Sequence, residues 1–116
     1  MNLDHRTQES VDIVKLPERL MMADAASARA ILKDIIDQGS GKLILNLSAT
    51  SFMDSSGLAV IVSGLQAARK RDGDIYLCGM SKTVRALFEL TRLQTVFQIF
   101  DDEMVALRAF GGTMST

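Results

Sequence analysis

Apolar residues along this chain alternate between short continuous runs and helical spacings. Four runs rich in Val, Ile and Leu are predicted to be strands, at residues 11–16, 42–47, 75–78 and 96–100. The segments after them carry apolar residues three and four positions apart and predict four helices, over 23–38, between Asp54 and Asp72, over 82–90 and over 104–110. Alternating strands and helices predict an α/β fold, with helices packed on a mixed or parallel sheet of four to five strands.

Two of the predicted strands differ in pattern. Residues 42–47 are almost wholly apolar, which is typical of a central strand covered on both faces, whereas residues 11–16 alternate and predict one well-buried face, ending at Pro17. The first helix is expected to end at Gly39-Ser40-Gly41 and to bury a stripe made of Ala26, Ala30, Ile31, Ile35 and Ile36. In the second helix, the expected stripe is Leu58, Ile61, Val62, Leu65 and Ala68.

Polar residues just before the helices predict their N-caps. Asp54 or Ser55 can cap the second helix, Ser81 the third, and Asp101 or Asp102 the fourth. Each of these side chains offers an oxygen that can accept a hydrogen bond from an unpaired backbone N–H of the first turn.

Length and composition set the class of protein. With 116 residues and 47% apolar content, the chain is expected to form a single domain over 1–116, with its core over about 11–110 and a flexible tail at 111–116. The net charge of −1 argues against a nucleic-acid partner. No apolar run approaches the ~20 residues needed to span a bilayer, and the N-terminus lacks a signal-peptide core. We therefore expect a cytoplasmic protein without membrane insertion.

Residues that commonly carry catalysis are scarce. His5 is the single histidine and is expected in a mobile N-terminal arm, so a Ser-His-Asp triad is not predicted. Cys78 is the single cysteine and is expected to be a small buried residue, so neither a disulfide nor a thiolate metal cluster can form within the chain. We predict no enzyme activity, no metal site and no cofactor.

The most informative segment is Asp54-Ser55-Ser56-Gly57-Leu58, which displays two hydroxyl groups at the start of a helix. Backbone N–H groups and the positive end of the helix dipole favour a phosphate there. Gly57 costs helix stability and is expected to leave the surface bare beside the hydroxyls. The pattern therefore predicts a contact site that a kinase can modify.

Three stretches resemble the signature of bacterial anti-sigma factor antagonists of the STAS domain family. They are Leu45-Asn46-Leu47 with 52–61 (FMDSSGLAVI), 73–79 (GDIYLCG) and 84–93 (VRALFELTRL). The resemblance covers most of residues 11–110 and implies a STAS-type domain that acts by partner switching. It implies that an anti-sigma serine kinase binds the unphosphorylated protein and phosphorylates Ser55, with Ser56 as the alternative acceptor, and that a PP2C-type phosphatase reverses the modification. The kinase's other client can be a sigma factor or another effector.

The resemblance also implies a surface for the kinase around the serines. Asp54, Ser55, Ser56, Gly57 and Leu58 are its expected members. Family members often carry an acidic residue just after the position of Leu20, where this chain has Met21-Met22; these side chains either contact the partner or pack beneath the helix. The alternative function is a STAS binding subunit of another assembly, such as a lipid transporter complex or a stress-signalling scaffold, without phospho-switching.

Overall fold

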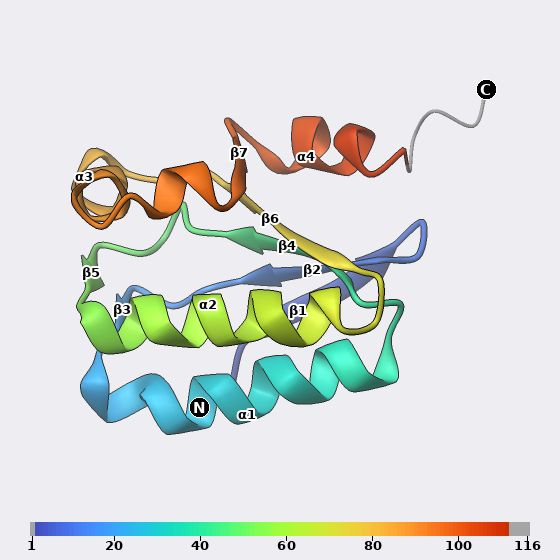
Figure 1. Cartoon of the computed structure of the whole chain (residues 1–116), viewed down its shortest axis with the longest axis horizontal. Helices are drawn as coiled ribbons and strands as arrows, with labels where there is room; N and C mark the ends of the chain where they lie inside the picture. The colour runs from blue at the N-terminus through green and yellow to red at the C-terminus, as the bar shows by residue number, and fades with distance from the viewer. Residues whose placement is uncertain (1, 112–116) are drawn as a thin grey trace.

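The computed structural model describes residues 2–111 and has a five-stranded mixed sheet at its centre (Figure 1). In spatial order the strands are β1 (Asp4–Gln8), β2 (Val11–Lys15), β4 (Lys42–Asn46), β6 (Asp74–Cys78) and β7 (Gln98–Phe100). β1 is antiparallel to β2, and the other neighbours are parallel. β4 is the third of the five strands, which confirms the central position predicted from its apolar run.

Helices cover both faces of this sheet. Helices α1 (Met22–Gln38) and α2 (Ser55–Arg69) run side by side over one face, and α4 (Glu103–Ala109) lies over the other (Figure 1). At one end of the sheet, the short parallel strands β3 (Arg19–Leu20) and β5 (Phe52–Met53) pair where α1 and α2 begin. The remaining elements are α3 (Lys82–Leu90) and the 3-10 turn η1 (Leu93–Thr95).

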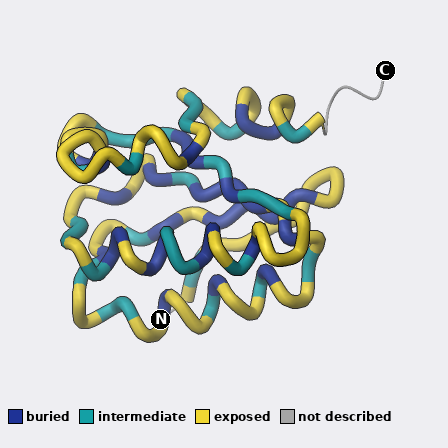
Figure 2. The backbone as a smooth tube through the Cα atoms, viewed as in Figure 1, coloured by how far each residue is buried: buried dark blue, intermediate teal, exposed yellow. Residues whose placement is uncertain are grey.

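Two apolar cores lie on the two faces of the sheet. Val14 and Leu45 belong to the larger core under α1 and α2, whereas Ile13 and Ile44 belong to the smaller core under α4. Figure 2 shows the central strands as the most deeply buried part of the chain. The expectation of a single buried face for residues 11–16 is wrong, because α4 covers the second face of β2 and buries Val11 with Ile13.

The two long helices differ in how well their buried faces were predicted. In α2, Leu58, Ile61, Leu65 and Ala68 are buried and Val62 is half-buried, so the expected stripe is confirmed. In α1, the buried residues are Ala28, Leu32 and Ile36, and Ile31 and Ile35 are half-buried. The expected stripe is therefore confirmed at its three isoleucines and wrong at Ala26 and Ala30, which are exposed. Alanine is common on all sides of α1, and its small methyl group does not fix which face packs, whereas the larger Leu32 does.

The expected mobile N-terminal arm is also wrong, because residues 4–8 form β1. All five side chains of β1 are exposed, so the strand has no hydrophobic pattern by which to recognise it. On the face toward α1, His5 Nε2 lies 2.8 Å from Asp12 Oδ1, and Thr7 Oγ1 donates a hydrogen bond of 2.9 Å to the same oxygen. These polar contacts help to hold the edge strand on the sheet.

A polar network docks α4 on the second face. Glu103, in the first turn of α4, pairs with Arg6 of β1 and accepts a hydrogen bond of 2.7 Å from Asn46 Nδ2 of β4. Partial burial acts to raise the pKa of Glu103, but the Arg6 and Asn46 hydrogen bonds outweigh it, and the pKa is lowered. Asp102 caps α4 by accepting a hydrogen bond of 3.0 Å from the Val105 N–H. The sequence had offered Asp101 or Asp102 as the cap, and the structure has Asp102.

The remaining expectations at the ends of elements are mostly confirmed. Ser81 caps α3 through the Val84 N–H, and α1 ends at Gly39. Cys78 is buried, and burial raises the pKa of its thiol to about 12, so the thiol stays protonated at neutral pH. Most of the predicted tail at 111–116 lies outside the described residues.

The turn between β1 and β2 places two ordinary residues in the left-handed region. Gln8 pairs with Val11, so the loop is two residues long, and Glu9 and Ser10 have φ of 53° and 69°. Positive φ at both positions is the geometry of a type I′ hairpin, which favours Asn followed by Gly. Side chains other than Asn, Asp and Gly are strained there.

We predict that the double substitution Glu9→Asn, Ser10→Gly raises the free energy of unfolding by about 1 kcal/mol, because both residues adopt positive φ more readily. Urea unfolding followed by circular dichroism measures the change. The control is Ser51→Gly, at an exposed loop position without positive φ, which should give no gain. Equal stabilisation by both variants would contradict the strain at the turn.

Candidate functional site

The side chain of Asp54 lies where the N-termini of α1 and α2 meet. Its Oδ1 accepts a hydrogen bond of 3.1 Å from the Gly57 N–H in the first turn of α2. Its Oδ2 accepts one of 3.0 Å from the N–H of Met22, the first residue of α1. One carboxylate therefore caps α2, as predicted, and also joins it to a second helix.

These hydrogen bonds set the charge state of the carboxylate. The Gly57 N–H makes the largest contribution and lowers the pKa of Asp54; partial loss of water acts to raise it, and the N–H groups of Met22 and Ser56 lower it further. The net shift is downward, so Asp54 carries a full negative charge at neutral pH. This charge lies between the positive ends of two helix dipoles, which favour it.

The two serines of the motif differ in exposure. Ser55 is the first residue of α2 and is exposed, whereas Ser56 is half-buried. No hydrogen bond joins the Ser55 hydroxyl to another of residues 2–111, so this hydroxyl is not committed to holding the fold. The predicted acceptor is thus open to a visiting enzyme, while Asp54 beside it does the capping.

Gly57 is not the bare surface position that was expected. It is buried, and a Cβ added there would lie 2.3 Å from the carbonyl oxygen of Leu20 and 2.8 Å from Met53 Cγ. Glycine is needed because the first turn of α2 packs directly on the backbone of β3. Leu58 is only 5% exposed, which confirms its expected packing role, while the contact role expected of both residues stays a prediction.

Exposed apolar side chains lie near the start of α2. We use "rim" for Met22, Phe52 and Leu90, which are 75%, 48% and 82% exposed. Met22 is bonded through its backbone to Asp54, and Phe52 precedes Asp54 by two positions. Leu90 lines a groove together with Met53, the residue before Asp54. Of the two methionines predicted to contact the partner or pack beneath the helix, Met22 is exposed and Met21 is half-buried.

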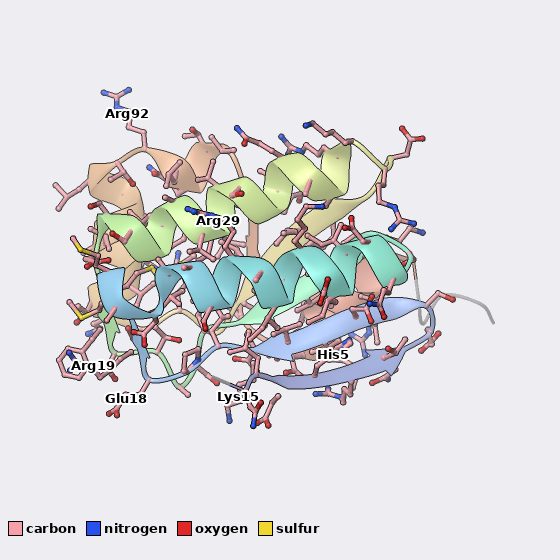
Figure 3. All side chains as sticks on the ribbon, turned by 90° about the horizontal axis from the view of Figure 1, so that it is seen from below. His5, Lys15, Glu18, Arg19, Arg29 and Arg92 are labelled. Carbon is pink, nitrogen blue, oxygen red and sulfur yellow. The ribbon has the colours of Figure 1, made fainter. Side chains whose placement is uncertain are left out.

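A cation adjoins this rim. The Arg19 guanidinium lies 5.2 Å from the centre of the Phe52 ring and within 3.6 Å of Met21 Sδ. Figure 3 shows Arg19 at the end of the molecule where α1 and α2 begin. The sequence reasoning did not identify Arg19, Phe52 or Leu90 as site residues. Of these three residues, only Leu90 could have been recognised as exposed from the sequence. It follows Phe88 by two positions in α3, and two residues rotate a helix by ~200°, so Leu90 faces away from the side on which Phe88 is buried.

Groups that could hold a metal are not found near the site. Among residues 2–111, no three His, Cys, Asp or Glu side chains are close enough together to hold a metal ion. The described helices also include none that is long and apolar enough to cross a membrane. The arrangement presents an exposed hydroxyl, a fixed charge and an apolar rim, which suits recognition by another protein.

We predict that Gly57→Ala lowers the free energy of unfolding by about 1–3 kcal/mol, because the new methyl group would overlap the Leu20 carbonyl oxygen. Gly64→Ala is the matched control in the same helix, since the three atoms nearest its methyl group would all be side-chain Cδ1 atoms, the closest being that of Ile75 at 3.1 Å. Better helix propensity should keep its change within about 1 kcal/mol. Equal effects in urea unfolding would contradict the close packing at Gly57.

We predict that Asp54→Asn destabilises the protein at neutral pH, because an amide keeps one acceptor oxygen and turns an NH₂ donor toward the second helix. The folded-state pKa of Asp54 lies below its ordinary value of 3.8. The stability that the ionised carboxylate contributes is therefore present above pH 3.8 and is lost as the pH falls through the folded-state pKa. The difference between the parent and the variant in urea unfolding should be constant above about pH 5 and shrink toward pH 2. A difference that does not depend on pH would contradict the ionised cap.

Comparisons with known proteins bear on the family and the fold of this chain. The chain is 28% identical over 99 residues to the anti-sigma-B factor antagonist of Staphylococcus aureus, covering 85% of this chain and 92% of that protein. Its fold matches a candidate anti-sigma factor antagonist from Thermotoga maritima with a TM-score of 0.86, at 25% identity over 92% of each chain. It also matches the anti-sigma factor antagonist SpoIIAA in its unphosphorylated form, with a TM-score of 0.79. That match has 24% identity and covers 95% of this chain and 97% of SpoIIAA, and it concerns the fold alone.

The family itself is given by a sequence model of the STAS domain, which matches residues 2–106. This range includes every strand of the sheet, the Asp54 cap and both serines of the motif. The chain therefore belongs to the STAS domain family, among proteins that include anti-sigma factor antagonists.

Proposed function

We propose that this protein is an anti-sigma factor antagonist that works by partner switching through Ser55. It binds an anti-sigma serine kinase while Ser55 carries a free hydroxyl, and it leaves the kinase once Ser55 is phosphorylated. A PP2C-type phosphatase restores the hydroxyl by hydrolysis. The observation that carries this proposal is the exposed, uncommitted Ser55 hydroxyl beside a carboxylate already bound to two helices.

The chemistry at Ser55 is a phosphoryl transfer from ATP. The Ser55 oxygen forms a bond to the γ-phosphorus, its proton passes to a base of the kinase, and the bond from that phosphorus to the β-phosphate oxygen breaks to release ADP. The kinase supplies the catalytic groups, and this chain supplies the acceptor at the first position of α2. A phosphate at this position is favoured by the helix dipole and by first-turn N–H groups, so the helix stays intact.

Charge determines whether phosphorylation strengthens or weakens binding to the partner. Phosphorylation adds about −1.5 to −2 charge units next to ionised Asp54. A partner surface that fits the apolar rim and a neutral hydroxyl would then face a concentrated negative charge that must lose water. Like charges and unpaired polar groups at an interface weaken binding, so the phosphorylated protein dissociates.

Exposure favours Ser55 over Ser56 as the acceptor. Ser56, at the second position of α2, is half-buried and is therefore less accessible to a kinase than Ser55. SpoIIAA, which shares the fold, has been solved in a phosphorylated form as well as an unphosphorylated one. The switch requires no cofactor in this chain and suits a regulator of transcription in the bacterial cytoplasm.

We predict that Ser55→Ala abolishes phosphorylation by the kinase captured from the source cell, while the control Ser56→Ala is phosphorylated normally. Intact-protein mass spectrometry after incubation with kinase and ATP counts the phosphoryl groups. If Ser56→Ala loses phosphorylation and Ser55→Ala keeps it, the acceptor is Ser56. Undiminished phosphorylation of both variants would place it outside the motif.

Binding tests the switch separately from the modification. Ser55→Glu should weaken kinase binding in calorimetry by about tenfold or more, because it adds a charge beside Asp54, while Ser55→Ala should bind like the parent. Equal binding of all three proteins would contradict the charge mechanism. Capture of membrane transporter subunits in place of a kinase, with no effect of Ser55→Glu, would favour a STAS binding subunit without phospho-switching.

A further inference from the structure

A groove of about 750 Å³ lies between the β1–β2 hairpin and the C-terminal half of α1. Asp34, Ile35 and Gln38 line it from the helix, and His5 and Thr7 line it from the hairpin. In Figure 3, His5 lies at this hairpin, far along α1 from Arg19. The groove is therefore separate from the Ser55 site, which lies at the opposite end, where α1 and α2 begin.

Negative charge dominates the lining of this groove. Asp12 and Asp34 contribute two carboxylates, and the described lining residues include no Lys or Arg. Asp12 is only 5% exposed and stands in β2 between apolar neighbours that are also buried. A buried carboxylate is costly unless its oxygens are paired, and His5 and Thr7 of the hairpin pair only one of the two oxygens of Asp12.

The two oxygens of Asp12 are used unequally. Oδ1 receives both hydrogen bonds from the hairpin, from His5 and from Thr7. Oδ2 points toward Gly39, where an added Cβ would lie 2.2 Å away, and no hydrogen bond reaches it from residues 2–111. The end of α1 thus comes close to the carboxylate without satisfying it.

Apolar surface completes the groove. Ile31 and Ile35 are half-buried on the face of α1 that looks over the hairpin, and Leu3 is half-buried opposite them. An inorganic cation would leave this surface wet, and the described residues provide no group of three metal-binding side chains. An anion would be repelled by the carboxylates. The lining matches a molecule with a positive group and a short hydrocarbon part.

We propose that this groove binds a small organic cation, an amine or guanidine with a short hydrocarbon chain. Its charged group pairs with Asp12, Asp34 adds to the attraction, and its hydrocarbon covers Ile31 and Ile35. The proposal is independent of the Ser55 switch, so either can fail without the other.

The test is a titration of the full chain with pentylammonium, 1-pentanol and pentanoate, which share a hydrocarbon chain and differ in charge. Amide shifts in ¹H–¹⁵N spectra report binding at each residue. Pentylammonium should shift the amides of Asp12, Ile35 and Gly39 with saturation, and the other two should not. Equal shifts from pentylammonium and 1-pentanol, or no saturating shift within the groove, would overturn the proposal.

Charge variants on α1 test the site itself. Asp34→Lys should weaken pentylammonium binding about fivefold or more, because it places a cation at the groove. Asp37→Lys is the matched control, since Asp37 pairs with Lys33 and does not line this groove; its effect should stay under about twofold through screening by salt. Equal weakening by both variants would overturn the site. Asp12→Asn should weaken binding about tenfold or more, and if it unfolds the protein, the Asp34 and Asp37 pair still decides.

Discussion

The structure depends on one carboxylate that serves two helices. α1 begins after Met21, whose thioether offers no oxygen to the free N–H groups of the first turn. The acceptor for the Met22 N–H comes instead from Asp54, which at the same time caps α2. The N-terminal ends of both long helices are therefore joined through a single side chain, with Gly57 allowing the first turn of α2 to reach the backbone at Leu20.

This arrangement divides two tasks between adjacent residues. Asp54 is committed to the fold, because each of its oxygens accepts a helix N–H. Ser55 projects from a start of helix that Asp54 already holds in place, and its hydroxyl has no structural hydrogen bond among residues 2–111. Under the proposed switch, a phosphate on Ser55 would change the surface that a partner meets while Asp54 continues to cap the helix beneath it. The same surface includes the apolar rim of Met22, Phe52 and Leu90, which carries no charge and would not be changed by a phosphate.

Local patterns predicted the features that depend on neighbouring residues. The apolar run at Leu43–Leu47 located the central strand, and Asp54 could be recognised as a cap because its partner Gly57 is three positions away. The second bond of Asp54 joins residues 32 positions apart and has no local pattern. Gly57 was misread for the same reason, since the contact that demands glycine is with the distant Leu20.

Two other errors have different causes, both physical. β1 is held by backbone pairing and by polar contacts to Asp12, so its sequence shows no apolar alternation. In α1, alanines on several faces gave competing stripes, and only packing against α2 and the sheet selects the face of Leu32. Leu90 and Phe52 stay exposed in the fold although apolar residues are usually assigned to the core.

The composition of β1 bears on how the protein behaves at high concentration. Its outer edge offers unpaired backbone groups, which in other sheets recruit strands from neighbouring molecules and start fibrils. Here that margin consists entirely of exposed polar and charged side chains, including Asp4 and Arg6. A strand from another copy would have to bury these charges to add to the sheet, so this edge of the sheet discourages self-assembly.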